Sequence, residues 1–207
     1  METQKIPFII YAEGTPNPES MKFVANKILL AEGATAEYKT IAETGQAPLP
    51  QKLFEFPFTK QVFISANYIT LTKHAFVSWD DILMETRVFL TEYLNAGKPI
   101  ILEVPQKEVA VDNTFTATKT VFTEHASPQN EIEEKIVDVL EQYIRPAVEQ
   151  DGGLITFKSF VDGVVTVQLK GACSGCPSST VTLKAGIEGL LKRLLPEAVK
   201  EVVSEAV

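Results

Sequence analysis

The segment around Asp162-Gly163 constrains the fold most strongly, because it places a tight turn between two runs of β-forming residues. The runs 154–160 and 164–169 are rich in Val, Ile, Phe and Thr. An Asp-Gly pair between two such runs predicts a β-hairpin, since both turn residues need a positive φ. The flanking elements are expected to be two helices and a short last strand, at 131–150, 177–195 and 199–203. Residues 131–207 are therefore predicted to form an α-β-β-α-β domain.

The first of these helices has recognisable signals at both ends. Asn130 is a favoured N-cap residue, and glutamates at 131, 133 and 134 suit the positive end of the helix dipole. Pro146 is expected to kink the last part of the helix, because proline has no N–H to donate.

Residues 1–103 are expected to form a second small domain. Strands are predicted at 6–11, 21–24, 61–65 and 68–72, and helices at 48–54 and 79–95. Ala66-Asn67 joins two of these strands as a hairpin, and Ser78 is the expected N-cap of the longer helix. Residues 104–130 lack a sustained period and are long for a connection inside a compact domain, so they are interpreted as a linker. The predicted fold class is α+β, with two small domains.

Composition excludes some functions. The net charge of −8 divides evenly, with −4 in residues 1–130 and −4 in residues 131–207, which argues against binding nucleic acid through a basic surface. No segment approaches the roughly 18 apolar residues that span a bilayer, so no membrane contact is expected. The first residues lack a signal or transit pattern, and a cytoplasmic location is the default expectation. Two cysteines in a reducing compartment are ligands or redox groups more often than a structural disulfide.

The two cysteines, Cys173 and Cys176, lie between the predicted hairpin and the helix after it. Pro177 suits the first helical position, which makes Cys176 the expected N-cap. Thiolates at a helix N-terminus accept backbone N–H groups and have a lowered pKa. Gly171 and Gly175 allow the backbone to curl around an inorganic core. This local pattern predicts two exposed, deprotonated sulfurs that point outward.

Several kinds of site use a pair of cysteines at this spacing: a thioredoxin-like dithiol, half of a zinc site, part of an iron–sulfur site, or no site at all. The dithiol is less favoured because the proline follows the second cysteine and the domain is short for a thioredoxin fold. Zinc needs two more ligands, and neither His74 nor His125 lies at ligand spacing. An iron–sulfur cluster takes four thiolates, which two chains together supply from Cys173 and Cys176. The cluster is then expected at the interface of a homodimer.

Longer motifs around the cysteines carry a family resemblance. Residues 144–153 (IRPAVEQDGG) and 171–184 (GACSGCPSSTVTLK) closely resemble the C-terminal domain of NifU-like (Nfu) proteins, and the match extends over 131–207. The first half resembles the Nfu N-terminal domain more loosely, through Thr15-Pro16-Asn17-Pro18 and the segments at 47–54 and 62–73. It departs from the family at Ser65-Ala66, where a glycine-containing turn is usual, and at Pro50, which interrupts a short helix.

The resemblance implies a non-enzymatic scaffold or carrier that binds a 4Fe–4S cluster and delivers it to apo-proteins; a 2Fe–2S cluster is the alternative cargo. Carried over by motif, the cluster and metal ligands are Cys173 and Cys176. The implied partners are an upstream cluster donor, apo iron–sulfur clients and a second copy of the chain. The N-terminal domain is implied to be a client-interaction or regulatory module without a catalytic motif. A dithiol oxidoreductase and a dimer held by structural zinc remain the competing hypotheses.

Overall fold

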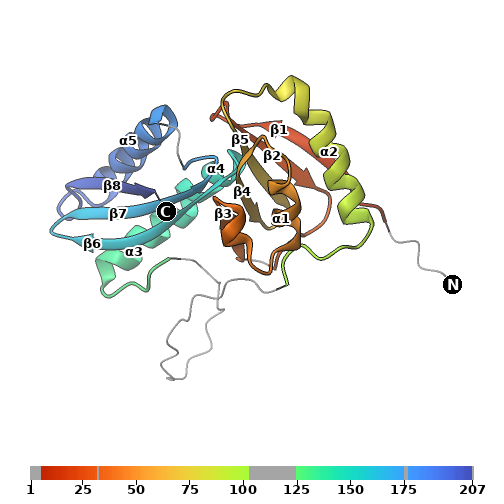
Figure 1. Ribbon diagram of the computed structural model, residues 1–207. Coiled ribbons are helices and arrows are strands. Elements are labelled where there is room, and N and C mark those ends of the chain that lie inside the picture. Colours follow the sequence, from red (N-terminus) through yellow and green to blue (C-terminus); the bar gives the residue numbers. More distant parts are fainter. Residues whose placement is uncertain (1–5, 32, 103–124, 175–176, 207) are drawn as a thin grey trace, which may run out of the picture.

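The computed structural model of the chain describes residues 6–31, 33–102, 125–174 and 177–206. Two sheets lie in two domains with separate hydrophobic cores, which Figure 1 shows side by side. The first sheet has the strand order β1-β2-β5-β4-β3 with all neighbours antiparallel. Its strands are β1 (Ile10–Gly14), β2 (Ser20–Ala25), β3 (Thr35–Tyr38), β4 (Thr59–Ser65) and β5 (Tyr68–Lys73).

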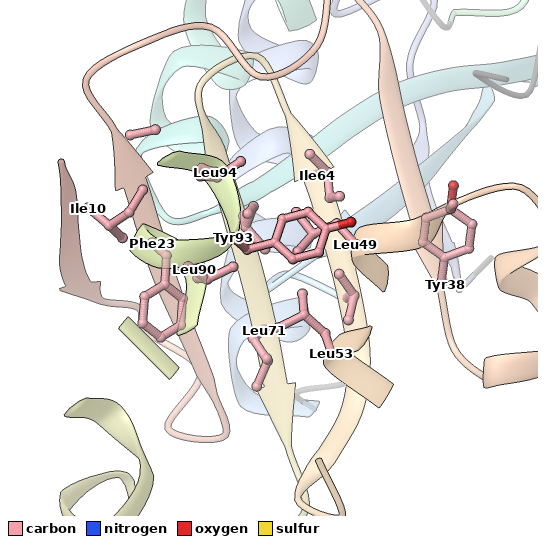
Figure 2. Packing of buried hydrophobic residues seen from close by; sticks show 14 of the residues in the cluster. Ile10, Phe23, Tyr38, Leu49, Leu53, Ile64, Leu71, Leu90, Tyr93 and Leu94 are labelled. Atoms are coloured by element: carbon pink, nitrogen blue, oxygen red, sulfur yellow. The ribbon is translucent and has the colours of Figure 1, made fainter. Parts of the chain in front are cut away.

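The helices of the first domain cover one face of this sheet. After the 3-10 turn η1 (Ile41–Thr44) come α1 (Pro48–Phe54) and α2 (Trp79–Asn95), which pack on the same side (Figures 1 and 2). Fully buried leucines from α1 and α2 meet Phe23 and Leu71 of the sheet in the core of this domain. No helix in the described ranges is long and apolar enough to cross a membrane.

The opposite face of the same sheet is directed toward the second domain. Successive residues of a strand point to opposite faces, so Lys22 and Thr70 lie on the other side from Phe23 and Leu71. Lys22 and Thr70 are register partners across β2 and β5. Every residue of β5 is buried, as expected for a strand that is covered on both faces. The first domain therefore offers a polar sheet face that is not exposed to solvent.

The second domain has the predicted α-β-β-α-β order, with a three-stranded sheet in the order β6-β7-β8. Its elements are α3 (Glu131–Val139), the π-helix η2 (Leu140–Ile144), α4 (Arg145–Gln150), β6 (Gly153–Val161), β7 (Val164–Gly171), α5 (Pro177–Leu194) and β8 (Glu201–Ala206). β6 and β7 form the antiparallel hairpin around Asp162, whose φ is 52°, and β8 runs parallel to β7. The α+β fold class expected from the sequence is confirmed.

Local signals predicted most elements well. Both predicted helices of the first domain have the observed bounds, and the hairpin turn at Ala66 has a φ of 40°. The first strand was predicted too early, because it begins only at Ile10. The N–H groups of Phe8 and Ile9 are bonded to side chains of Asn95 and Asn26 instead of to a strand. The strand β3 was not predicted at all.

Pro146 changes the helix as expected, through a specific distortion. The Arg145 N–H donates to the Leu140 carbonyl, five positions back, and the π-helix η2 separates α3 from α4. Proline cannot donate to the carbonyl four positions before it, so a wider turn just ahead of Pro146 accommodates the missing hydrogen bond.

The predicted domain limits remain a prediction, and most of the predicted linker lies outside the described residues.

The described end of the predicted linker begins at His125. The His125 ring accepts a hydrogen bond from the Phe157 N–H at 2.7 Å, and its other nitrogen lies 2.5 Å from a Glu141 carboxylate oxygen. The Ala126 N–H donates to the Phe157 carbonyl. Residues 125 and 126 therefore pack on the second domain, and His125 anchors the chain there.

We expect Asn130→Ala to lower the free energy of unfolding by about 1 kcal/mol, because the lost side chain caps α3. Its Oδ1 accepts from the N–H groups of Ile132 and Glu133, both at 3.0 Å. Denaturant unfolding measures the change, and Asn130→Ser is the matched control because serine also caps. Equal losses in the two variants would contradict this role of the cap.

Candidate functional site

The loop that carries Cys173 connects β7 to α5 and is shaped by two glycines. Gly171 ends β7 with a φ of +66°, a conformation that favours glycine. A Cβ atom on Gly153 of the neighbouring strand would lie 2.7 Å from the Cys173 Sγ and 2.8 Å from the Lys170 carbonyl oxygen. The sulfur is thus directed against the backbone of β6.

Cys173 is buried, contrary to the expectation of an exposed sulfur. Its exposed fraction is 7%, and it belongs to the same apolar cluster as Leu169 and Ile187. Burial raises its pKa to about 12, and the nearby negative charge of Asp151 adds to the increase. The prediction of a lowered pKa is therefore wrong for Cys173 in this conformation, because desolvation of the thiolate dominates.

The other predicted ligand, Cys176, lies outside the described residues, as does Gly175. The side chains of residues 177–180 are also outside the description, so the expected capping by Cys176 stays a prediction. The backbone of α5 begins at Pro177, as predicted. The two predicted ligands therefore remain adjacent in sequence to the start of this helix.

Two turns of the second domain dock on the polar sheet face of the first domain. One is the turn after α4, where Thr70 Oγ1 donates to the Gly152 carbonyl at 2.7 Å and Tyr68 OH donates to the Gly153 carbonyl at 3.0 Å. A Cβ on Gly152 would lie 2.9 Å from Thr70 Oγ1, so this close approach requires glycine. Lys22 Nζ adds a contact to the carbonyl of residue 150.

The cysteine loop is the other docked turn, and three side chains of the first domain hold it. Asn17 Nδ2 donates to the Ala172 carbonyl at 3.1 Å, and Gln61 Nε2 donates to Ser174 Oγ at 3.0 Å. The Gly171 N–H donates to a Glu37 carboxylate oxygen at 2.7 Å. Residues on both sides of Cys173 are thus fixed by the first domain.

Gly171 has a packing role that the sequence did not suggest. A Cβ at this position would lie 2.6 Å from the Gly152 carbonyl oxygen and 2.8 Å from Phe63 Cδ1 of the first domain. Phe63 is fully buried and forms an apolar contact with Tyr68 and Leu154 across the two domains. The glycine is needed for packing against the first domain, and its expected role in bending around a bound group stays a prediction.

Glu37 is the central polar group of this docking and was not singled out from the sequence. Its Oε1 accepts from Gly171 N–H and from Gln61 Nε2 at 2.6 Å. Its Oε2 is buried and has no hydrogen-bond partner among the described residues. Burial raises the pKa of this carboxyl, although Lys39 and Lys170 oppose the increase by their charge.

A cavity of about 380 Å³ lies beside Cys173 and is formed by both domains. Its lining residues are Pro16 and Asn17 of the first domain and Asp151, Ala172, Cys173, Thr182 and Leu183 of the second. Asn17 is held in place because its Oδ1 accepts from the Glu19 N–H. The turn 15–18 of the first domain therefore faces the cysteine loop.

The histidines do not complete a metal site with Cys173. Among the described residues, no three His, Cys, Asp or Glu side chains form a group that could hold a metal ion. His74 stacks on Phe76 with ring centroids 5.4 Å apart, and His125 is bound to the backbone of β6. The described part of a single chain thus supplies too few ligands for zinc or for a cluster.

We expect Gly153→Ala to reduce the free energy of unfolding by roughly 1–3 kcal/mol, because its Cβ would overlap Cys173 Sγ. Gly186→Ala is the matched control, since a Cβ there meets nothing within 4 Å and alanine favours the helix. Urea unfolding of both variants tests the difference. If Gly153→Ala is as stable as the control, the cysteine loop accommodates the added Cβ without a loss of unfolding free energy, which would contradict the prediction.

The raised pKa of Glu37 predicts a pH dependence with a definite sign. A carboxyl whose pKa is higher in the folded state binds its proton more tightly when folded, so the protein loses stability as pH rises from the ordinary carboxyl value through the raised one. Lys39 and Lys170 are the charged groups that oppose the shift. Glu37→Gln should therefore gain stability relative to the parent as pH rises from the ordinary carboxyl value toward neutral pH, measured by denaturant unfolding. A constant difference over this range would contradict the assignment.

Comparisons with known proteins match both domains. A family model described as "Scaffold protein Nfu/NifU N terminal" matches residues 10–97, and the "NifU-like domain" matches residues 136–203. The proteins named "NFU1 iron-sulfur cluster scaffold homolog, mitochondrial" from Drosophila willistoni and Homo sapiens are 33% and 32% identical. The matches cover 98% and 91% of this chain and 66% and 68% of those relatives. The chain thus spans about two thirds of the length of these relatives.

Solved structures include a weaker likeness. The solution structure of a NifU-like protein from Saccharomyces cerevisiae has a TM-score of 0.43 and 22% identity, and it covers 50% of this chain and 92% of its own. The relatives' names place those proteins in mitochondria, and the cytoplasmic location expected here stays a prediction. From the matches over both domains, the chain belongs to the Nfu (NifU-like) family of iron–sulfur cluster scaffold proteins.

Proposed function

We propose that this protein binds a 4Fe–4S cluster through Cys173 and Cys176, shares it between two chains and transfers it to apo-proteins. The observation that carries the proposal is the place of Cys173, in the loop between β7 and α5 and inside the segment that matches the NifU-like domain. The chain has two cysteines, and a cluster takes four thiolates. Two cysteine loops related by twofold symmetry supply that number.

The buried position of Cys173 argues against dithiol chemistry in this conformation. A disulfide oxidoreductase needs an accessible thiolate of low pKa as its nucleophile. Cys173 is buried and has a raised pKa, so it is a poor nucleophile in this conformation. Iron binding supplies the charge that stabilises a coordinated thiolate, and metal ligation deprotonates thiols outright.

Cargo and chain have separate roles in this proposal. The cluster arrives from an upstream donor and leaves to apo iron–sulfur proteins, and the chain's residues bind it without catalysing a reaction. A site at a subunit interface has no further protein ligands, so partner sulfurs can replace the four thiolates one at a time. That property suits transfer.

Anaerobic reconstitution with iron and sulfide, followed by native mass spectrometry and metal analysis, tests the proposal. We expect a dimer with one cluster, which is about two iron atoms per chain, and loss of the cluster in both Cys173→Ala and Cys176→Ala. Ser204→Ala, a small change in β8 away from the loop, is the control and should retain the cluster.

Three outcomes would reject the proposal. A monomer with a full cluster would exclude sharing, and stoichiometric zinc without iron uptake would indicate a structural zinc dimer. Reduction of insulin disulfides without cluster uptake would indicate a dithiol oxidoreductase.

A further inference from the structure

The surface that holds the cysteine loop lies on the first domain and is built for the backbone of the second. Asn17, Gln61 and Glu37 contact residues 171–174, and Gln61 uses both amide hydrogens, one on Glu37 and one on Ser174. The contacts to residues 171–174 join positions more than a hundred residues apart, so they depend on how the two domains meet.

The docked loop keeps Cys173 turned inward. Ala172 and Ser174 on either side of it are held by the first domain, while the sulfur packs against Gly153 and the apolar core of the second domain. In this position the sulfur is largely shielded from solvent and lines a cavity that both domains form, so it does not face a second copy of the chain openly.

The interface between the two domains is of a type that can open. Most of its bonds are hydrogen bonds from polar side chains to backbone carbonyls, and one apolar cluster around Phe63, Tyr68 and Leu154 is shared by the domains. Interdomain contacts of this polar kind resemble transient interfaces, for which relative motion is the normal expectation.

We propose that the polar sheet face of the first domain is a docking surface for the chain's own cysteine loop, and that the docked form is a closed state. The domains must separate before the loop turns Cys173 outward to take or give a cluster. This proposal rests on the proposed function for its biological meaning, whereas the closed state itself exists without any cluster.

Alkylation of Cys173 in the full-length protein tests the closed state directly. The background variant Cys176→Ser leaves one thiol, and the rate of its reaction with N-ethylmaleimide is followed by intact mass under reducing conditions. Tyr68→Phe with Thr70→Val removes two bonds between the domains. Gln61→Ala removes one bond to the loop, at Ser174, and one to Glu37, which itself holds the loop. Each change should increase the alkylation rate of Cys173 on the order of tenfold. The removed hydrogen bonds form only in the closed state, so their loss shifts the equilibrium toward the open state.

Matched controls separate docking from general loss of stability. Tyr93→Phe with Thr86→Val removes the same chemical groups from bonds inside the first domain, and Gln51→Ala removes an amide that donates to the Gly45 carbonyl in the same domain. These controls should leave the rate unchanged. Circular dichroism confirms that each variant folds, so an increased rate is not due to unfolding.

The proposal is overturned if the docking variants react no faster than their controls, or if Cys173 of the background protein reacts as fast as in urea. A second arm follows cluster uptake with both cysteines present, where the docking variants should load faster and reach the same iron content. No iron uptake in any variant rejects the proposed function, whereas equal uptake rates with unequal alkylation reject only the link between closure and loading.

Discussion

The structure depends on the docking of two glycine turns against the polar sheet face of the first domain. Thr70 and Tyr68 hold the turn at Gly152-Gly153, and Glu37 holds the N–H of Gly171 at the start of the cysteine loop. Glycine lets the two backbones approach so closely, since Cβ atoms at these positions would overlap side chains or carbonyl oxygens. From this contact follow the burial of β5 on both faces and the cavity beside Cys173 that both domains form.

Glu37 shows that the docking has an energetic cost as well as a gain. A carboxylate with one oxygen that lacks a partner among the described residues is unfavourable in a buried place, and its pKa rises accordingly. A carboxylate at such a position holds the loop firmly only while the domains are together, and in the separated form water solvates it. The group therefore opposes permanent closure, in agreement with the proposed opening of the two domains.

Much of the fold could be predicted from the sequence because its signals are local. Caps, prolines and apolar periods located α2, and the Asp162-Gly163 turn located the second hairpin. The strand β3 was missed because its four residues are too few to show a clear alternation of apolar and polar side chains. Their strand conformation comes from pairing with β4. The environment of Cys173 was missed for a similar reason, since Asn17 lies 155 positions from its partner Ala172. The sequence held one signal for it. Phe63 and Tyr68 are aromatic residues that alternate with core residues along their strands, a pattern that indicates a sheet covered on both faces.

The cysteine motif and its family context predict the site, whereas the structure adds how the loop that carries Cys173 is held by the first domain. Hydrogen exchange at the Gly171 amide tests this account most directly, because that N–H donates to Glu37 across the two domains. If cluster loading requires separation of the domains, the amide is protected before loading and exchanges much faster once the cluster is bound. Equal protection of the Gly171 amide in the apo and loaded proteins would contradict the account, since the loop would then hold its cluster while still docked.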